Sequence, residues 1–103
     1  MTVQSDTIIK EKTKIVVKAP SKFKAVFVND EKTTMEFVMM LLQSVFGHTP
    51  DSAYHVMIET HNSGSAIAKM YNSFEIGEQE VSEALQMSRS HGYPLQIELE
   101  EDR

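Results

Sequence analysis

A short polar segment, Asn29-Asp30-Glu31, carries the side chains of this chain that are best suited to binding chemistry. It follows an apolar run that ends at Val28 and precedes a predicted helix start. Such residues favour turns, and acids near a helix N-terminus complement its dipole, so a purely structural role is one interpretation. The other interpretation is a cation site, because amide and carboxylate oxygens accept hydrogen bonds from an ammonium group.

Catalytic and metal-binding patterns are not found in the sequence. Among the four histidines, His55 and His61 are six residues apart, which places them on different faces of a helix, and no third ligand stands at metal-binding spacing. The chain has no cysteine, which excludes a disulfide scaffold, a Cys-ligated zinc site and a thiol nucleophile. Ser63-Gly64-Ser65 is more typical of a helix end than of a nucleophile turn. We therefore expect a binding protein without metal or cofactor, and not an enzyme.

Methionines supply candidate apolar surface near these polar groups. The chain has seven of them, and Met57 precedes His61 by one helical turn on the same face. Met35, Met57 and Leu95 can be ordinary core residues, and His61 can be a partly buried helix residue. Methionine also lines adaptable apolar pockets. An apolar pocket beside a carboxylate and a histidine would suit a ligand with one cation and one bulky apolar group.

Length and charge narrow the class of protein further. The chain has 103 residues, the size of one domain, and a formal net charge of −5 at pH 7. A chain this acidic is poorly suited to binding nucleic acid. Its longest apolar run, Phe37 to Leu42, is far shorter than the roughly 20 residues that span a bilayer, and no secretory signal is visible. We expect a cytoplasmic protein with neither a nucleic-acid nor a membrane partner.

Hydrophobic periodicity and turn residues predict the elements that position these side chains. A first helix starts at a Thr33-x-x-Glu36 capping box and stops at Gly47. A second helix opens at Thr49-Pro50-Asp51 and ends at Gly64. The remaining predicted elements are a helix over 78–91 and strands over 23–28, 66–71 and 93–100.

The predicted order is strand, helix, helix, strand, helix, strand. This order favours an α+β fold, a two-layer sandwich in which three helices cover one face of a small antiparallel three-stranded sheet. In the last strand Leu95, Ile97 and Leu99 point one way and polar residues the other, as in a sheet with one solvated face. Residues 1–20 are charged and lack a period, so we predict a flexible N-terminal extension before a domain over 21–103.

Two separated motifs resemble the signature of the ClpS family. Members of this family are adaptor proteins of the bacterial and plastid N-degron pathway. Val28-Asn29-Asp30-Glu31, Thr33 and Met35-Glu36-Phe37-Val38 are similar to the family's V-N-D-D-x-T-P-M-E-F-V. After Met57, His61-x-x-Gly64-x-Ala66 matches the family's H-x-x-G-x-A, and Pro94-Leu95 precedes the last strand. The resemblance covers residues 22–100 and implies the same α+β fold.

The resemblance also implies a function and a site. ClpS adaptors bind the first residue of a substrate protein and deliver it to a Clp AAA+ unfoldase of the ClpA or ClpC type. The positions that hydrogen-bond the free α-amino group are matched by Asn29, Asp30 and His61. The positions that form or border the pocket for the first side chain are matched by Thr33, Met35, Val38, Met57 and Leu95. The implied partners are substrates that begin with Phe, Tyr, Trp or Leu, bound by a monomer.

The sequence departs from the family pattern in three places. Glu31 replaces the second Asp and Thr34 replaces Pro. The segment 72–80 is one residue longer than usual and lies where the family contacts the unfoldase. Glu75 and Glu80 are the candidate contacts there, and a basic residue is usual at the position that Glu80 matches best. The alternative function is a related α+β module that binds another protein through its methionine-rich helix.

Overall fold

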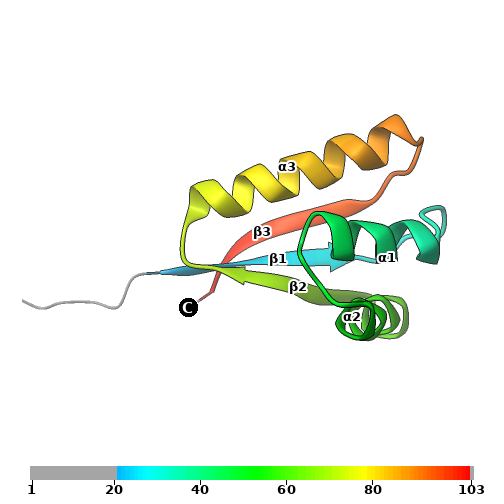
Figure 1. The fold of residues 1–103 in the computed structure, drawn as a ribbon, viewed down its shortest axis with the longest axis horizontal. Helices are drawn as coiled ribbons and strands as arrows, with labels where there is room; N and C mark the ends of the chain where they lie inside the picture. Colours follow the sequence, from blue (N-terminus) through cyan, green and yellow to red (C-terminus); the bar gives the residue numbers. More distant parts are fainter. Residues whose placement is uncertain (1–20, 103) are drawn as a thin grey trace, which may run out of the picture.

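The computed structural model describes residues 21–102, and its element order is the predicted one (Figure 1). The elements are β1 Lys22–Val28, α1 Met35–Ser44, α2 Pro50–Ser63, β2 Ser65–Tyr71, α3 Phe74–Ser90 and β3 Gln96–Asp102. The strands form one antiparallel sheet in the order β2-β1-β3. This confirms the α+β fold of three helices on a three-stranded sheet. The predicted extension over residues 1–20 lies outside the described residues.

The central strand β1 has a buried face and a solvated face. Ala25 and Phe27 have no exposed surface and belong to the core beneath the helices. On the opposite face, Val26 pairs with Ile67 of β2 and Glu98 of β3, and Ile67 is exposed. The helix α3 packs along β1 and β3, α2 packs against β2, and α1 lies beside α2. The alternation that predicts the strand therefore also selects the face that the helices cover.

The end of α2 joins the loop that follows β1. Gly64 adopts a left-handed conformation with φ of 91°, as expected for the residue that stops a helix. Its carbonyl oxygen accepts a hydrogen bond from the backbone N–H of Asn29 at 2.9 Å. This bond fixes the polar loop after β1 against the last turn of α2, which carries His61.

The start of α1 differs from the prediction by one residue. Thr34 is the N-cap, and its hydroxyl accepts from the N–H of Phe37 at 3.1 Å. Thr33 instead donates its hydroxyl to Asp30 Oδ2 at 2.8 Å. The predicted Thr33–Glu36 capping box is wrong, because the Asp30 carboxylate holds Thr33 in the preceding turn.

The helix α3 begins one turn earlier than predicted, at Phe74 instead of Glu78. Ser73 caps it by accepting from the N–H of Ile76 at 3.3 Å. The Phe74 ring packs edge-on against Phe23 of β1, with ring centroids 5.5 Å apart. This contact stabilises the first turn of α3, which the spacing of apolar residues in the sequence did not predict.

The strand β3 begins at Gln96, later than the predicted start at Tyr93. Arg89 Nη1 donates to the carbonyl oxygens of Tyr93 at 3.1 Å and Leu95 at 2.8 Å, so these carbonyls bond α3 instead of a neighbouring strand. The connection packs the Tyr93 ring against Phe37, with centroids 4.8 Å apart, and leaves Leu95 only 1% exposed.

Candidate functional site

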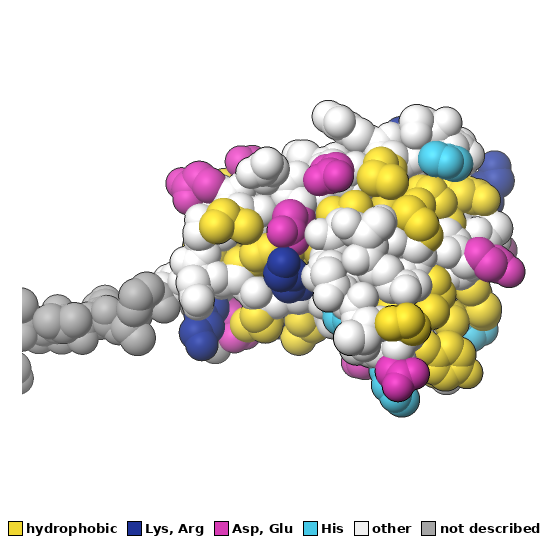
Figure 2. Space-filling model, in the orientation of Figure 1, with side chains coloured by type: hydrophobic (Ala, Val, Ile, Leu, Met, Phe, Trp, Pro, Cys, Tyr) yellow, Lys and Arg dark blue, Asp and Glu magenta, His cyan; other side chains and the backbone are white. Residues whose placement is uncertain are grey.

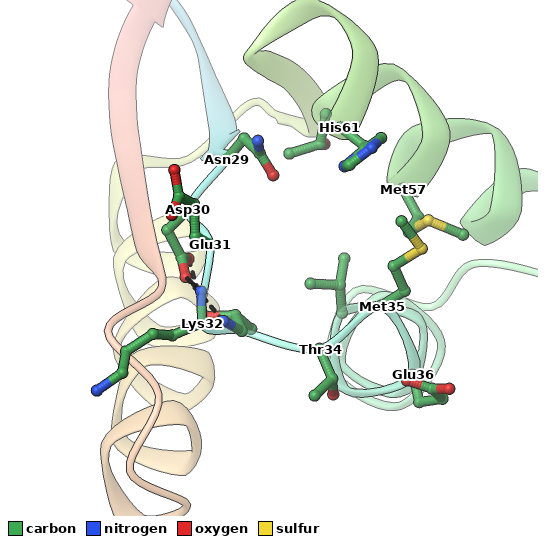
Figure 3. A pocket seen from close by; sticks show the side chains of 12 residues that line it. Asn29, Asp30, Glu31, Lys32, Thr34, Met35, Glu36, Met57 and His61 are labelled. Atoms are coloured by element: carbon green, nitrogen blue, oxygen red, sulfur yellow. Dashed lines mark hydrogen bonds between the residues drawn. The ribbon is translucent and has the colours of Figure 1, made fainter.

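A cavity of about 550 Å³ opens between the loop after β1, the start of α1 and the last turns of α2 (Figure 3). Its lining residues are Asn29, Asp30, Glu31, Lys32, Thr33, Thr34, Met35, Glu36, Val38, Met57, Thr60 and His61. Figure 2 shows hydrophobic side chains gathered at the end of the molecule where α1 and α2 lie, with acidic side chains and histidines among them. The cavity therefore combines apolar surface with hydrogen-bond acceptors.

Asn29 and His61 face each other across the mouth of the cavity (Figure 3). The hydrogen bond between Asn29 N–H and Gly64 sets their relative position. Both residues are exposed, and within residues 21–102 neither side chain makes a hydrogen bond to the protein. An amide oxygen and a neutral imidazole nitrogen are thus free to accept from one donor group between them.

The Asp30 carboxylate bonds its own loop. Its Oδ1 accepts from the N–H groups of Lys32 at 2.8 Å and Thr33 at 2.7 Å, in addition to the Thr33 hydroxyl on Oδ2. Partial burial acts to raise the pKa of Asp30, but these hydrogen bonds and the positive charge of Arg89 outweigh it and hold the pKa below its usual value. The ionised carboxylate therefore shapes the turn that presents Asn29 and Glu31.

The inner wall of the cavity is apolar. Val38 of α1 and Met57 of α2 are each 7% exposed, whereas Met35 is 44% exposed at the rim. The side chains of Met35 and Met57 converge in Figure 3. Thr60 also lines the cavity, and its buried hydroxyl donates to the Val56 carbonyl at 2.8 Å, so it presents no free donor. This wall suits a bulky apolar group.

The predicted pocket residues, Asn29, Asp30, Thr33, Met35, Val38, Met57 and His61, all line this one cavity. Leu95 is not among the lining residues and belongs to the core. Four further residues line the cavity that were not predicted as site residues: Lys32, Thr34, Glu36 and Thr60. Thr60 stands three residues after Met57 and next to His61, so helical spacing alone could have identified it.

The candidate unfoldase contacts lie at the opposite end of the molecule, at the start of α3 (Figure 1). Glu75 is exposed in the first turn. Glu80 is paired: its Oε1 lies 3.1 Å from Lys69 Nζ and accepts the Tyr71 hydroxyl at 2.7 Å. Burial, with the hydrogen bond to Glu80 and its charge, raises the pKa of Tyr71 far above its usual value.

The described part of the chain, residues 21–102, contains no group of three or more His, Cys, Asp or Glu side chains placed to hold a metal ion. None of its helices combines the length and apolar character needed to cross a bilayer.

The fold and the cavity together define a small α+β domain in which one cavity joins hydrogen-bond acceptors to an apolar wall. Comparison with known families gives a more specific assignment. Residues 18–98 match the family model described as "ATP-dependent Clp protease adaptor protein ClpS". The chain belongs to the ClpS family of Clp protease adaptors.

Relatives and a solved structure agree with this assignment. The chain is 35% identical over 96 residues to the ATP-dependent Clp protease adapter protein ClpS of Wolinella succinogenes, covering 93% of this chain and 91% of that protein. It is 32% identical over 99 residues to the ClpS adapter of Ruegeria sp., covering 96% and 87% respectively. Its fold is similar to Agrobacterium tumefaciens ClpS2 bound to L-phenylalaninamide, with a TM-score of 0.77, 31% identity, and coverage of 82% of this chain and 100% of that chain.

Proposed function

We propose that this protein binds the free α-amino group and bulky apolar first side chain of N-degron substrates and delivers them to a Clp AAA+ unfoldase. One observation carries the proposal: a single cavity places the acceptors Asn29 and His61 beside the apolar wall of Val38 and Met57. The similar A. tumefaciens protein bound to L-phenylalaninamide supports it, since that ligand joins an α-amino group to an aromatic side chain.

The amino group would be recognised by charge and hydrogen bonding. A free α-amino group has a pKa near 8, so it is mostly cationic at neutral pH. The Asn29 oxygen and a ring nitrogen of His61 would accept hydrogen bonds from two of its N–H groups. The neighbouring Glu31 and Asp30 carboxylates would supply negative charge. Hydrogen bonds to a charged group contribute about 1.5–3 kcal/mol each.

The hydrogen bonds of Asp30 support a more specific proposal for its role. Because both of its oxygens already accept hydrogen bonds from Lys32 and Thr33, we propose that Asp30 acts mainly by holding the loop. Glu31 lines the cavity without such bonds among the described residues, so its carboxylate is available to the substrate. Thr33, which donates to Asp30, contributes to the pocket in the same indirect way.

The first side chain would enter between the methionines and Val38. Full burial of a Leu or Phe side chain contributes roughly 1.5–3 kcal/mol. This gain adds to that of the amine contacts. Phe, Tyr, Trp and Leu are the expected first residues, because each presents a large apolar group without a branch at Cβ.

The direct test is the binding of labelled peptides that begin with Phe, measured by fluorescence anisotropy. An N-acetylated copy serves as the control, because acetylation removes both the charge and two of the donors. We expect the free peptide to bind and the acetylated one to lose at least tenfold in affinity, since each buried acceptor left unsatisfied costs roughly 1–3 kcal/mol. Equal binding of the two peptides would refute the amine pocket.

We propose that delivery uses the other end of the molecule. Glu75 and Glu80 remain our candidates for contact with a ClpA- or ClpC-type unfoldase, which would engage a cytoplasmic monomer of this protein. The separation supports the proposal, since a substrate in the cavity leaves the start of α3 uncovered (Figure 1).

A further inference from the structure

A second hollow, of about 630 Å³, lies on the outer side of α1. It is lined by Glu36, Met39, Met40, Gln43 and Ser44. These residues follow the i, i+3, i+4, i+7 and i+8 spacing, so they form one continuous stripe along the helix. No other described residue lines this hollow, so it is an open groove whose floor is this stripe of α1.

The middle of this groove is apolar, because Gln43 and Ser44 bond the backbone of their own helix and the charged Glu36 stands at one end. Gln43 Nε2 donates to the carbonyl of Met39 at 3.2 Å, and Ser44 Oγ donates to the carbonyl of Met40 at 2.7 Å. The Met39 and Met40 side chains are only partly buried, packed against the core on one side. Two flexible thioether side chains thus offer an adaptable apolar surface to a ligand.

The groove is continuous with the cavity proposed to hold the first substrate residue. Glu36 lines both of them. From Glu36 to Ser44 the helix rises about 12 Å, at roughly 1.5 Å per residue. An extended peptide advances about 3.3 Å per residue, so three to four residues cover the same distance. A chain leaving the first cavity along α1 would therefore bring its third or fourth residue over the stretch from Met40 to Gln43.

We propose that this stripe, the α1 groove, is a second subsite that takes an apolar side chain at the third or fourth position of the same substrate. The inference rests on the proposed function, because it requires the substrate's first residue to occupy the neighbouring cavity. Side chains of an extended chain alternate in direction, so only one of the two positions faces the groove in a given substrate. The α1 groove would add affinity for sequences with Leu, Ile, Met or Phe there.

The test is a leucine scan of a peptide that begins with Phe and continues with Gly and Ser, measured by fluorescence anisotropy. Leu is placed in turn at positions two to six. We expect Leu at position three or four to tighten binding about three- to tenfold relative to Ser, the gain from partial burial of one side chain. Equal affinity along the scan would overturn the proposal.

Two variants assign the effect to the groove. Met40→Gln replaces the apolar floor with a polar group of similar length, and Gln43→Trp fills the groove from an exposed position without touching the core. Both should remove the advantage of Leu and keep binding of the Gly/Ser peptide within twofold. The matched control is Met70→Gln, which changes a methionine that is 43% exposed on β2, away from α1. It should retain the full advantage.

The outcomes separate this inference from the proposed function. If the Phe peptide binds, its acetylated copy does not, and the Leu advantage persists in both groove variants, the second subsite is wrong while the amine pocket stands. If acetylated and free peptides bind equally, the proposed function itself fails. Circular dichroism of each variant verifies folding, and Gln43→Trp keeps the test valid should Met40→Gln unfold.

Discussion

Met35 is the residue that we expect to discriminate among first side chains. It is 44% exposed at the rim and meets the buried Met57 across the cavity (Figure 3). A side chain branched at Cβ is stiff and wide near the backbone, where the two methionines narrow the entrance. We predict that peptides beginning with Ile or Val bind much more weakly than those beginning with Leu, and that Met35→Ala reduces this difference. Wild-type protein that binds Ile and Leu peptides equally would show that Met35 is not a gate.

Asp30 should matter to stability as well as to binding. Asp30→Ala removes the acceptor for three hydrogen bonds, so we expect a loss of about 1–2 kcal/mol in the free energy of unfolding, together with weaker peptide binding. The free energy of unfolding would be measured by urea denaturation. Lys32→Ala is the control, because it retains the backbone N–H that bonds Asp30.

The same residue predicts a pH dependence. The folded-state pKa of Asp30 is lowered, so its ionised form stabilises the folded protein above the unfolded pKa of about 4, and this contribution disappears as pH falls through the folded value. The stability difference between wild type and Asp30→Ala should therefore be constant from pH 5 to 7 and shrink below pH 4. A difference that stays constant down to pH 2.5 would contradict this assignment.

At the scale of elements, Gly64 connects α2 to the loop that carries Asn29. Its φ of 91° is costly for a residue with a Cβ, and its carbonyl accepts from the Asn29 N–H. We predict that Gly64→Ala lowers the free energy of unfolding by about 1 kcal/mol or more and weakens peptide binding, because the two sides of the pocket lose their fixed spacing. Asn62→Ala, an exposed change in the same turn, should affect stability by less than about 0.5 kcal/mol. An unchanged affinity in the glycine variant would mean that the hydrogen bond does not position Asn29.

At the scale of the whole molecule, recognition and delivery should be separable. Glu80 is paired with Lys69 and Tyr71, so Glu80→Lys would bring two cations together and remove the acceptor of the Tyr71 hydroxyl. Glu80→Gln is the better variant, because it leaves an acceptor and exposes the positive charge of Lys69, in keeping with the basic residue that is usual there in the family. We expect faster degradation of a Phe-started substrate by a Clp unfoldase and protease, with peptide affinity unchanged. If the degradation rate is also unchanged, Glu80 lies outside the docking surface.

The segment before the domain offers a second way to separate substrate recognition from delivery. The described residues that line the cavity all lie within residues 29–61. We predict that deleting residues 1–18 leaves peptide affinity within twofold and impairs degradation of the same substrate, because the described cavity-lining residues all lie outside this segment. A truncated protein that delivers as well as the full chain would remove any role for this segment.

The local sequence determined most of the elements. Alternation in β1 and β2, the Thr49-Pro50 start of α2 and its Gly64 stop are short-range signals, and the structure follows each of them. The pocket residues were predicted by their match to two motifs, which carry information from the family that composition and periodicity do not contain.

The tertiary structure decided what depends on contacts between distant residues. Thr34 and not Thr33 is the N-cap of α1, because Thr33 is hydrogen-bonded to Asp30. The helix α3 starts earlier than predicted, where the Phe74 ring packs against Phe23 of β1. The charge of Glu80 is balanced by Lys69, eleven residues away and on another element. The strand β3 starts later than predicted because Arg89 of α3 bonds the carbonyls of Tyr93 and Leu95. In each case a hydrogen bond or ring contact between separate segments decides the outcome over the preference of the local sequence. The residue that makes such a contact is known only once the chain is folded.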